Sequence, residues 1–352
     1  YELMSDSAWS PEPINLDSWL PAYARNRYAS EQAALAGAWK LLRESVYSSF
    51  TPHPTFGWQN MSLGHGSVHR SPKFIEAVKS FLSAAATHGN NPNFRDDAVE
   101  MAGLALSLRA EDWFHLANQA KSAGDMRMFQ EAVDGGIDLL LKADQLLESH
   151  GLHRLDRWLS YTRRHGGTAA DVGMWERNAR QIITVWGPPV NDYACRMWSG
   201  LIRDFYAPRL KAMTDAMAAG KAFDRHAWEA AWVDGKGVSA ITPLANPAAS
   251  ARDWVDAAWN RRLPPLHTDE KNLLGTWSPA ELDSTWTTLE WPLTPEQFSA
   301  IKGVRFQFTA GNHRLDIRKV ELVADGQVVA SDNHDGSTGD QLPTARVAPA
   351  LT

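Results

Sequence analysis

The spacing of apolar residues between Leu16 and about Asn260 is the feature that most constrains the fold of this chain. Apolar residues in this stretch recur three and four positions apart, which places them on one face of an α-helix. The stretch from Glu31 to Ser49 is typical, with the apolar set Leu35, Trp39, Leu42 and Val46. The pattern predicts a mainly α protein, in which a multi-helix bundle or array occupies residues 1–262.

Helix start signals divide this stretch into separate helices. Ser71 precedes a proline, a typical start because serine caps the first turn and proline fits its first position. Thr168 and Asp171 have the spacing of a capping box, with Asp in place of the usual Glu or Gln. Two longer helices are expected to begin at Asn93 and Asp125.

A proline-rich break interrupts the helical pattern after Trp186. The residues Gly187-Pro188-Pro189 stop the preceding helix, because proline lacks the N–H and clashes with the turn before it. The pattern then predicts a new helix that is capped by Asn191 or Asp192 and runs through Trp198.

The pattern changes from helical spacing to period two near the C-terminus. Residues 263–283 contain turn formers without a sustained period and are predicted to be a linker. Alternation then begins at Trp286, and further strands are predicted at 304–308 and 315–323. Asp325-Gly326 is a typical hairpin turn into residues 327–330. Residues 284–352 are therefore predicted to form a small antiparallel β-sandwich-like segment, without evident closing strands.

The composition argues against several classes of protein. A net charge of −6 disfavours nucleic-acid binding, which depends on clustered Lys and Arg. No apolar run reaches the roughly 18 residues that span a bilayer. The single cysteine, Cys195, excludes an internal disulfide and a thiolate zinc cluster, and is expected to be a small buried residue on a helix. Sixteen tryptophans favour carbohydrate contacts, because indole faces stack on sugar rings, although Trp also fills helical cores.

Ordered pieces of the sequence resemble the C-terminal region of the α-N-acetylglucosaminidase family. The most specific is Trp186-Gly187-Pro188 followed closely by Asp192-Tyr193-Ala194. The other pieces are Tyr1-Glu-Leu-Met4, Arg27-Tyr28, Ala38-Trp39, Ser45-Val46-Tyr47 and Phe205-Tyr206-Ala-Pro-Arg209. The β segment resembles sandwich modules of bacterial glycosidases, through residues 313–317, 320–322 and 332–339.

The resemblance implies part of a retaining exo-glycosidase that releases terminal α-linked N-acetylglucosamine from glycans. Such enzymes need two carboxyl groups about 5 Å apart, one as nucleophile and one as acid/base. In the family both lie on a (β/α)₈ barrel that packs against the helical region, so they are expected upstream of Tyr1. This chain alone is then expected to be inactive and to need no cofactor, metal, nucleic acid or membrane. A secreted or periplasmic bacterial protein is implied.

The resemblance also implies that Trp186 and Tyr193 line the sugar pocket, by stacking on and hydrogen-bonding the N-acetylglucosamine ring. Val190 and Asp192 lie between them and are expected to contribute to the same substrate-binding wall. A helix break is a reasonable place for a pocket wall, because it re-aims side chains. From the residues alone, packing of both rings in the core is the competing interpretation.

Other candidates have weaker support. Trp58, Gln59 and Asn60 lie in an irregular stretch that favours an ordinary surface loop over a functional one. His65 and His69 have the spacing of a helical metal pair, but the glycines around His65 make a helix there improbable, and no metal site is expected.

Three acidic groups also have ordinary interpretations. The run Asp332 to Gly336 favours a turn over a calcium site, since its spacing differs from that of a helix-loop-helix calcium loop. Asp96-Asp97 belongs to a helix start, where the helix dipole favours negative charge. Glu111-Asp112 is expected on a solvated helix face. None of them is a persuasive acid/base pair.

Two other functions compete with the glycosidase interpretation. One is a non-catalytic carbohydrate-binding or scaffold protein, which the coding sequence upstream of Tyr1 would distinguish. The other is a helical-toroid polysaccharide lyase, which needs a Tyr, His and Arg set that the spacing here does not assemble.

Overall fold

The computed structural model describes residues 1–48, 54–186, 194–266, 274–277, 285–301, 303–307, 317–333 and 344–347. The chain divides into two compact units. The first comprises Tyr1–Asn118 and Phe129–Arg261 and is called the helical unit below. The second comprises Gln119–Met128 and Arg262–Thr352 and is called the C-terminal unit.

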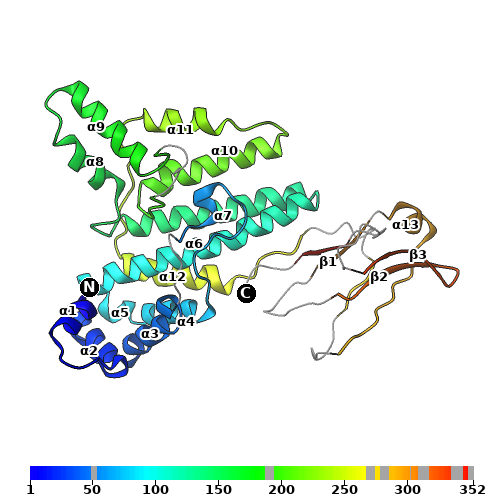
Figure 1. Ribbon diagram of the computed structural model, residues 1–352, viewed down its shortest axis with the longest axis horizontal. Coiled ribbons are helices and arrows are strands. Elements are labelled where there is room, and N and C mark those ends of the chain that lie inside the picture. Colours follow the sequence, from blue (N-terminus) through cyan, green and yellow to red (C-terminus); the bar gives the residue numbers. More distant parts are fainter. Residues whose placement is uncertain are drawn as a thin grey trace. The chain divides into compact units, whose positions relative to one another are not determined.

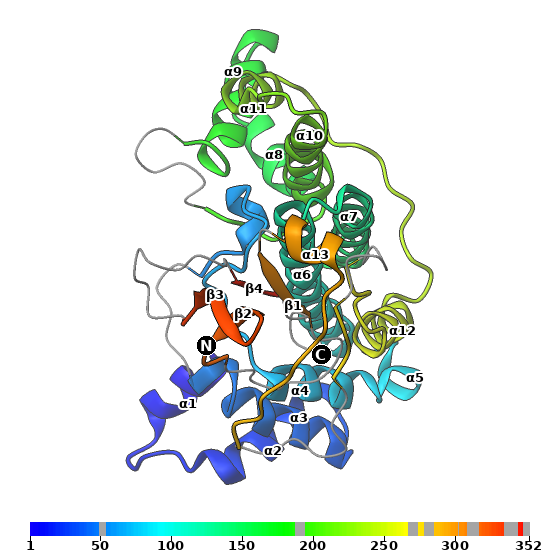
Figure 2. The ribbon, with the colours of Figure 1, turned by 90° about the vertical axis from the view of Figure 1, so that its right-hand side faces the viewer.

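Helices make up the helical unit, which confirms the predicted mainly α fold. In both views the hairpin of α6 and α7 lies between two groups of helices, with α8 to α11 on one side and α2 to α5 and α12 on the other (Figures 1 and 2). The helices are α1 (Glu2–Trp9), α2 (Leu16–Tyr28), α3 (Ala33–Arg43), α4 (Pro72–Leu82), α5 (Ala85–His88), α6 (Pro92–Ser122), α7 (Met126–Leu147), α8 (Leu155–Arg163), α9 (Ala169–Ile182), α10 (Ala207–Ala218), α11 (Arg225–Val233) and α12 (Pro247–Asn260).

The core of the helical unit is centred on α6. Residues 105–114 of this helix are all buried, including four polar or charged residues. Helical periodicity predicts that one face of a helix is buried. This part of α6 is buried on all sides, so more of its residues are buried than the periodicity predicts. None of the described helices combines the length and the apolarity needed to cross a membrane.

Several predicted helix starts are confirmed. Helix α4 begins at Pro72 as expected, although the Ser71 side chain makes no capping hydrogen bond. At the start of α9 the Thr168 hydroxyl accepts a hydrogen bond from the Asp171 N–H at 3.2 Å, and the Asp171 carboxylate accepts from the Thr168 N–H at 3.0 Å. The Asp125 carboxylate accepts from the Met128 N–H at 3.0 Å beside the start of α7. Local capping signals were sufficient to predict the starts of α7 and α9, because the two hydrogen-bonding partners are three residues apart in the sequence.

The helix predicted through Trp198 is wrong. The described residues 194–200 are not helical, and the backbone adopts positive φ at Cys195 (41°) and Gly200 (83°). Left-handed backbone interrupts an α-helix. Cys195 is accordingly a partly exposed loop residue, not a buried residue on a helix.

Helical structure resumes with a π-helical turn, Ile202–Tyr206, that leads directly into α10. The cap for this start comes from another helix. The buried Asp144 carboxylate of α7 accepts hydrogen bonds from the N–H groups of Gly200 at 2.7 Å and Arg203 at 3.0 Å. No local sequence signal predicts a cap supplied from more than fifty residues away.

The C-terminal unit contains two small pairs of strands in its described residues. Strands β2 (Val320–Ala324) and β3 (Gln327–Asp332) form an antiparallel hairpin across Asp325-Gly326, as predicted. Both turn residues have positive φ, which the type I′ hairpin turn requires. A short helix, α13, spans Pro295–Ala300.

Two details of the β prediction differ from the structure. Strand β1 (Val304–Gln307) pairs in parallel with β4 (Thr344–Val347), a strand that the sequence pattern did not predict. The described residues 285–291 form no strand, and Trp286 is exposed. Period two alone does not make a strand, because its backbone groups also need a paired neighbour.

Candidate functional site

An open pocket of about 410 Å³ lies in the helical unit, between an irregular loop, α6 and the segment before the π-helical turn. Its volume is in the range of small-ligand sites. The loop contributes residues between Pro54 and His69, α6 contributes Leu104, and the other wall is formed by His153 and Cys195, Arg196, Met197 and Trp198.

Buried ionic contacts hold the loop of residues 54–70 against α6. The Glu111 carboxylate accepts hydrogen bonds from the N–H groups of Gly57 at 2.6 Å and Gly66 at 2.8 Å. Arg70 donates to Glu111 at 2.9 Å and also binds Asp112. Both carboxylates are fully buried, so the prediction of a solvated helix face is wrong. The loop folds over α6 and supplies the hydrogen-bond donors that buried carboxylates require.

Glycine is required at two positions of this loop. A Cβ atom on Gly57 would collide with the carbonyl oxygen of Gly64, and one on Gly66 would collide with the carbonyl oxygen of Thr55. The close approach of these backbones lets a single carboxylate oxygen of Glu111 accept from both amides.

Trp58 and Gln59 are interior residues, and the prediction of an ordinary surface loop is wrong for both. Trp58 packs against Phe56 and Tyr206, with ring centroids 5.1 and 5.3 Å apart. The Gln59 amide group donates to the Cys195 carbonyl at 2.8 Å and accepts from the Phe56 N–H at 2.9 Å. Gln59 thus joins the two walls of the pocket.

The segment of Cys195 to Trp198 presents a charged and an aromatic side chain. The Arg196 guanidinium lies 5.9 Å from the centroid of the Trp198 ring, within cation–π range. Behind this segment, burial raises the pKa of Asp144 to about 6, although Arg203 and two backbone amides oppose that shift. The pocket wall formed by Cys195 to Trp198 is therefore followed directly by backbone that hydrogen-bonds to the buried Asp144 carboxylate.

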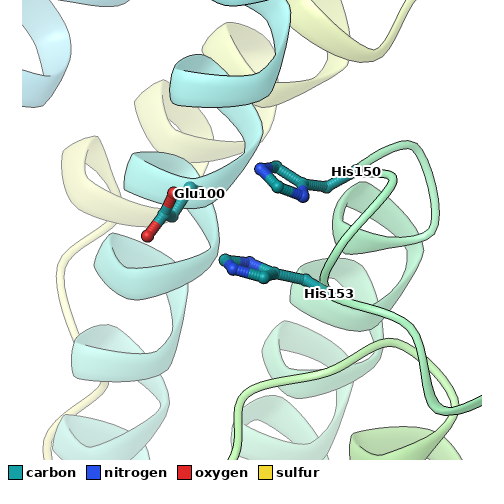
Figure 3. A group of neighbouring side chains, drawn as sticks. All are labelled: Glu100, His150 and His153. Carbon is teal, nitrogen blue, oxygen red and sulfur yellow. The ribbon is translucent and has the colours of Figure 1, made fainter. Parts of the chain in front are cut away.

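Glu100, His150 and His153 form a polar group beside the pocket (Figure 3). Glu100 belongs to α6, and the two histidines lie in the connection between α7 and α8. One donor or acceptor atom of each residue lies within 4.8 Å of the others. The two imidazole rings are stacked, with centroids 4.1 Å apart and planes 16° from parallel.

The protonation of this group follows from its surroundings. The Nδ1 atom of His150 accepts a hydrogen bond from the Leu152 N–H at 3.1 Å, so in the neutral ring Nε2 carries the proton. Burial, with His150 adding to it, lowers the pKa of His153 to about 4. Desolvation of its carboxyl group by the surrounding protein raises the pKa of Glu100 above its usual range, although the residue as a whole remains exposed.

The arrangement does not fit a bound metal ion. A tetrahedral zinc ion holds its ligand atoms at about 2.0–2.1 Å, which places two nitrogen ligands about 3.3 Å apart with converging lone pairs. The lone pairs of two parallel stacked rings do not converge, and the His150 Nε2 atom is occupied by its proton. His65 and His69 belong to no metal-binding group within the described part of the chain.

The predicted site residues are only partly described. Trp186 follows α9, and its side chain remains 45% exposed. The backbone N–H of Trp186 donates a hydrogen bond to the Gln181 carbonyl at 2.8 Å. The Gln181 side chain donates back to the Trp186 carbonyl at 3.1 Å. Val190, Asp192 and Tyr193 lie outside the described residues. Cys195, which lines the pocket, is two positions after Tyr193 in the sequence.

Two weaker acidic candidates have structural partners where they are described. Asp97 accepts two hydrogen bonds from Arg27, at 2.6 and 2.7 Å, and one from the Tyr28 hydroxyl at 2.6 Å. Asp332 is buried at the end of β3, and the residues of its run from position 334 onward lie outside the described residues.

Sequence reasoning missed Glu100, His150 and His153 as a group. They are about fifty residues apart in the sequence and share no local motif. Only the pair His150 and His153, three positions apart, was visible as a signal.

Comparison with known proteins identifies relatives of this chain. A profile of the family described as alpha-N-acetylglucosaminidase (NAGLU) C-terminal domain matches residues 19–256. Human alpha-N-acetylglucosaminidase is 26% identical over 246 residues, which are 65% of this chain and 33% of the human protein.

Two structures from Clostridium perfringens have a similar fold. A family 89 glycoside hydrolase in complex with PUGNAc has a TM-score of 0.64 at 20% identity, over 73% of this chain and 33% of its own. A second structure, in complex with its substrate GlcNAc-alpha-1,4-galactose, has a TM-score of 0.61 at 21% identity, over 72% and 32%. The chain thus spans about a third of the length of these relatives.

Proposed function

This chain belongs to the α-N-acetylglucosaminidase C-terminal domain family, and from that premise we propose that it is the helical part of a retaining exo-glycosidase. The proposed reaction releases terminal α-linked N-acetylglucosamine from glycans, through a glycosyl-enzyme intermediate. The observation that carries the proposal is the match of residues 19–256 to a family whose human relative is named for this activity.

We assign the two catalytic carboxylates to a (β/α)₈ barrel upstream of Tyr1. The described acidic pairs of this chain support the assignment. Glu111 and Asp112 are fully buried and bound to Arg70, so they have no access to a substrate. Asp97 is likewise held by Arg27 and Tyr28. A reacting acid/base pair needs contact with the glycosidic oxygen, which these groups lack.

The proposed role of the chain is to form one wall of the sugar pocket, with Trp186, Tyr193, Asp192 and Val190. The exposed side chain of Trp186 supports this role, since an indole at the protein surface can stack on a sugar face. A secreted or periplasmic location is part of the same proposal.

A turnover assay tests where the catalytic groups lie. This chain alone should release no chromophore from a chromogenic α-N-acetylglucosaminide, whereas the complete protein with its upstream residues should hydrolyse it. Hydrolysis by a pure preparation of this chain would place the catalytic pair within residues 1–352 and contradict the assignment.

The pocket-wall role predicts a kinetic defect in one variant of the complete protein. Trp186→Ala should lower kcat/KM about tenfold or more, because a lost stacking contact of about 1.4 kcal/mol corresponds to one decade. Trp277→Ala, at a similarly exposed tryptophan of the C-terminal unit, is the control and should leave kcat/KM unchanged. A Trp186→Ala protein with wild-type kcat/KM would refute the assignment.

The second candidate function is a non-catalytic carbohydrate-binding or scaffold protein. The pocket lined by Arg196 and Trp198 is the feature that would serve such a protein, and sugar binding by this chain alone would favour this alternative. The coding sequence upstream of Tyr1 distinguishes the two, because a barrel with two suitably placed glutamates fits only the glycosidase.

A further inference from the structure

We propose that Glu100, His150 and His153 bind a hydroxyl group of a neutral sugar at the edge of the pocket. This inference rests on the proposed function, which makes a glycan the ligand, and adds a binding contact that neither the sequence pattern nor the named relatives assign.

His150 is a fixed donor toward Glu100. Its Nδ1 atom is engaged by the Leu152 N–H, so the proton of the neutral ring resides on Nε2 at the opposite edge. The outer edges of both imidazole rings point toward Glu100 (Figure 3). The ring is more than nine-tenths buried, and its stacking on His153 holds its plane in place.

Glu100 supplies the matching acceptor. Its side chain is exposed on α6, and among the described residues no hydrogen bond to its carboxylate is found. Leu104, one turn further along the same helix, lines the pocket, and so does His153. The acceptor thus lies one helical turn from a residue of the pocket wall, and the donor ring stacks on another.

The spacing suits one bridging oxygen atom. A hydroxyl that accepts from His150 and donates to Glu100 makes two hydrogen bonds of about 2.7–2.8 Å, which at a tetrahedral angle separates the two groups by about 4.5 Å. The observed separations are within 4.8 Å. The nearly parallel ring planes and the proton on His150 Nε2 do not suit a tetrahedral zinc ion. A neutral hydroxyl thus satisfies both groups where a cation does not.

The first experiment titrates this chain with methyl α-N-acetylglucosaminide and with GlcNAc-α-1,4-galactose, followed by calorimetry. Glu100→Ala should raise Kd about tenfold or more, because hydrogen bonds to charged groups are among the stronger ones. Glu76→Gln, at an exposed glutamate of α4, is the matched control and should leave Kd unchanged. His150→Phe should weaken binding similarly while far-UV circular dichroism confirms that the helices remain.

A set of mono-deoxy analogues of the disaccharide identifies the hydroxyl. One analogue should bind the wild-type chain about tenfold more weakly, and Glu100→Ala should not weaken the binding of that analogue further. Losses that add for every analogue would mean that the three side chains hold only water, and the proposal would be wrong. Absence of sugar binding, or zinc binding that is lost in Glu100→Ala, would overturn it as well.

Turnover by the complete protein separates this inference from the proposed function. If the complete protein hydrolyses its substrate and Glu100→Ala changes neither KM nor kcat, the hydroxyl contact is refuted and the glycosidase stands. If the complete protein has no activity while the deoxy series behaves as expected, the glycosidase fails and the contact stands.

Discussion

At the scale of single residues, buried charged side chains connect separate elements of the helical unit. Arg209 and Glu229 form a buried ion pair, and Arg209 also donates to the Gln59 carbonyl at 2.6 Å. Glu176 accepts two hydrogen bonds from Arg163, both at 2.8 Å, and one from the Gly237 N–H at 2.9 Å. Such pairs cost desolvation free energy, so they stabilise the fold only while every partner is present.

Glu176 makes the stability of the helical unit depend on pH. Burial alone would raise its pKa, but the hydrogen bonds from Arg163, Gly237 and Arg180 outweigh burial and lower the pKa to about 2, from 4.5. A lowered folded-state pKa gives a stabilisation that is present above pH 4.5 and is lost as the pH falls toward 2.

Glu176→Gln should therefore lower the free energy of unfolding by about 3 kcal/mol at pH 7. The difference from the wild type should shrink below pH 4.5, and urea unfolding at pH 7 and pH 3 measures it. A difference that is the same at both pH values would show that the ionised carboxylate is not what stabilises this contact.

At the scale of elements, irregular segments are held in place by helices. The loop of residues 54–70 is fixed by Glu111 of α6, and the start of the π-helical turn is capped by Asp144 of α7. The sequence located the loop of residues 54–70 by its glycines and prolines, but it predicted a helix where residues 194–200 are irregular. It did not show their conformation, because the hydrogen-bond partners are more than forty residues away.

Gly57→Ala tests the tight packing of the loop at residues 54–70. The added methyl group meets a backbone carbonyl that cannot move aside, so the free energy of unfolding should fall by about 1–3 kcal/mol. Gly37→Ala is the matched control, because a Cβ at this position of α3 meets nothing within 4 Å. It should stabilise the protein by about 0.5–1 kcal/mol through helix propensity. Thermal unfolding of both variants tests this prediction. Equal Tm values for Gly57→Ala and Gly37→Ala would contradict it.

At the scale of the whole molecule, the helical unit has a core of its own. Val99, Leu106 and Leu140 on the central hairpin are fully buried. We propose residues 1–262 as an α-helical domain, 263–283 as a linker and 284–352 as the β segment. Because each domain is expected to fold around its own residues, loss of one should leave the other intact.

Truncation tests this division. A chain that ends at Leu266, which keeps the buried Leu263 and Leu266 side chains, should retain the helical circular dichroism and the Tm of the full chain within a few degrees. A large drop in Tm or loss of the helical signal would mean that the helical unit depends on the later residues.

The sequence by itself determined the features that depend on near neighbours: the mainly α class, the starts of α4 and α9, the Asp325-Gly326 hairpin and the family. Capping and helical periodicity act over three or four residues, so both partners of each contact are visible together. The tertiary structure decided the non-helical wall at Cys195 and the grouping of Glu100 with His150 and His153. These features depend on contacts between segments that are distant in the sequence. Such contacts stabilise the fold only once the helices have packed together, so no local pattern predicts them.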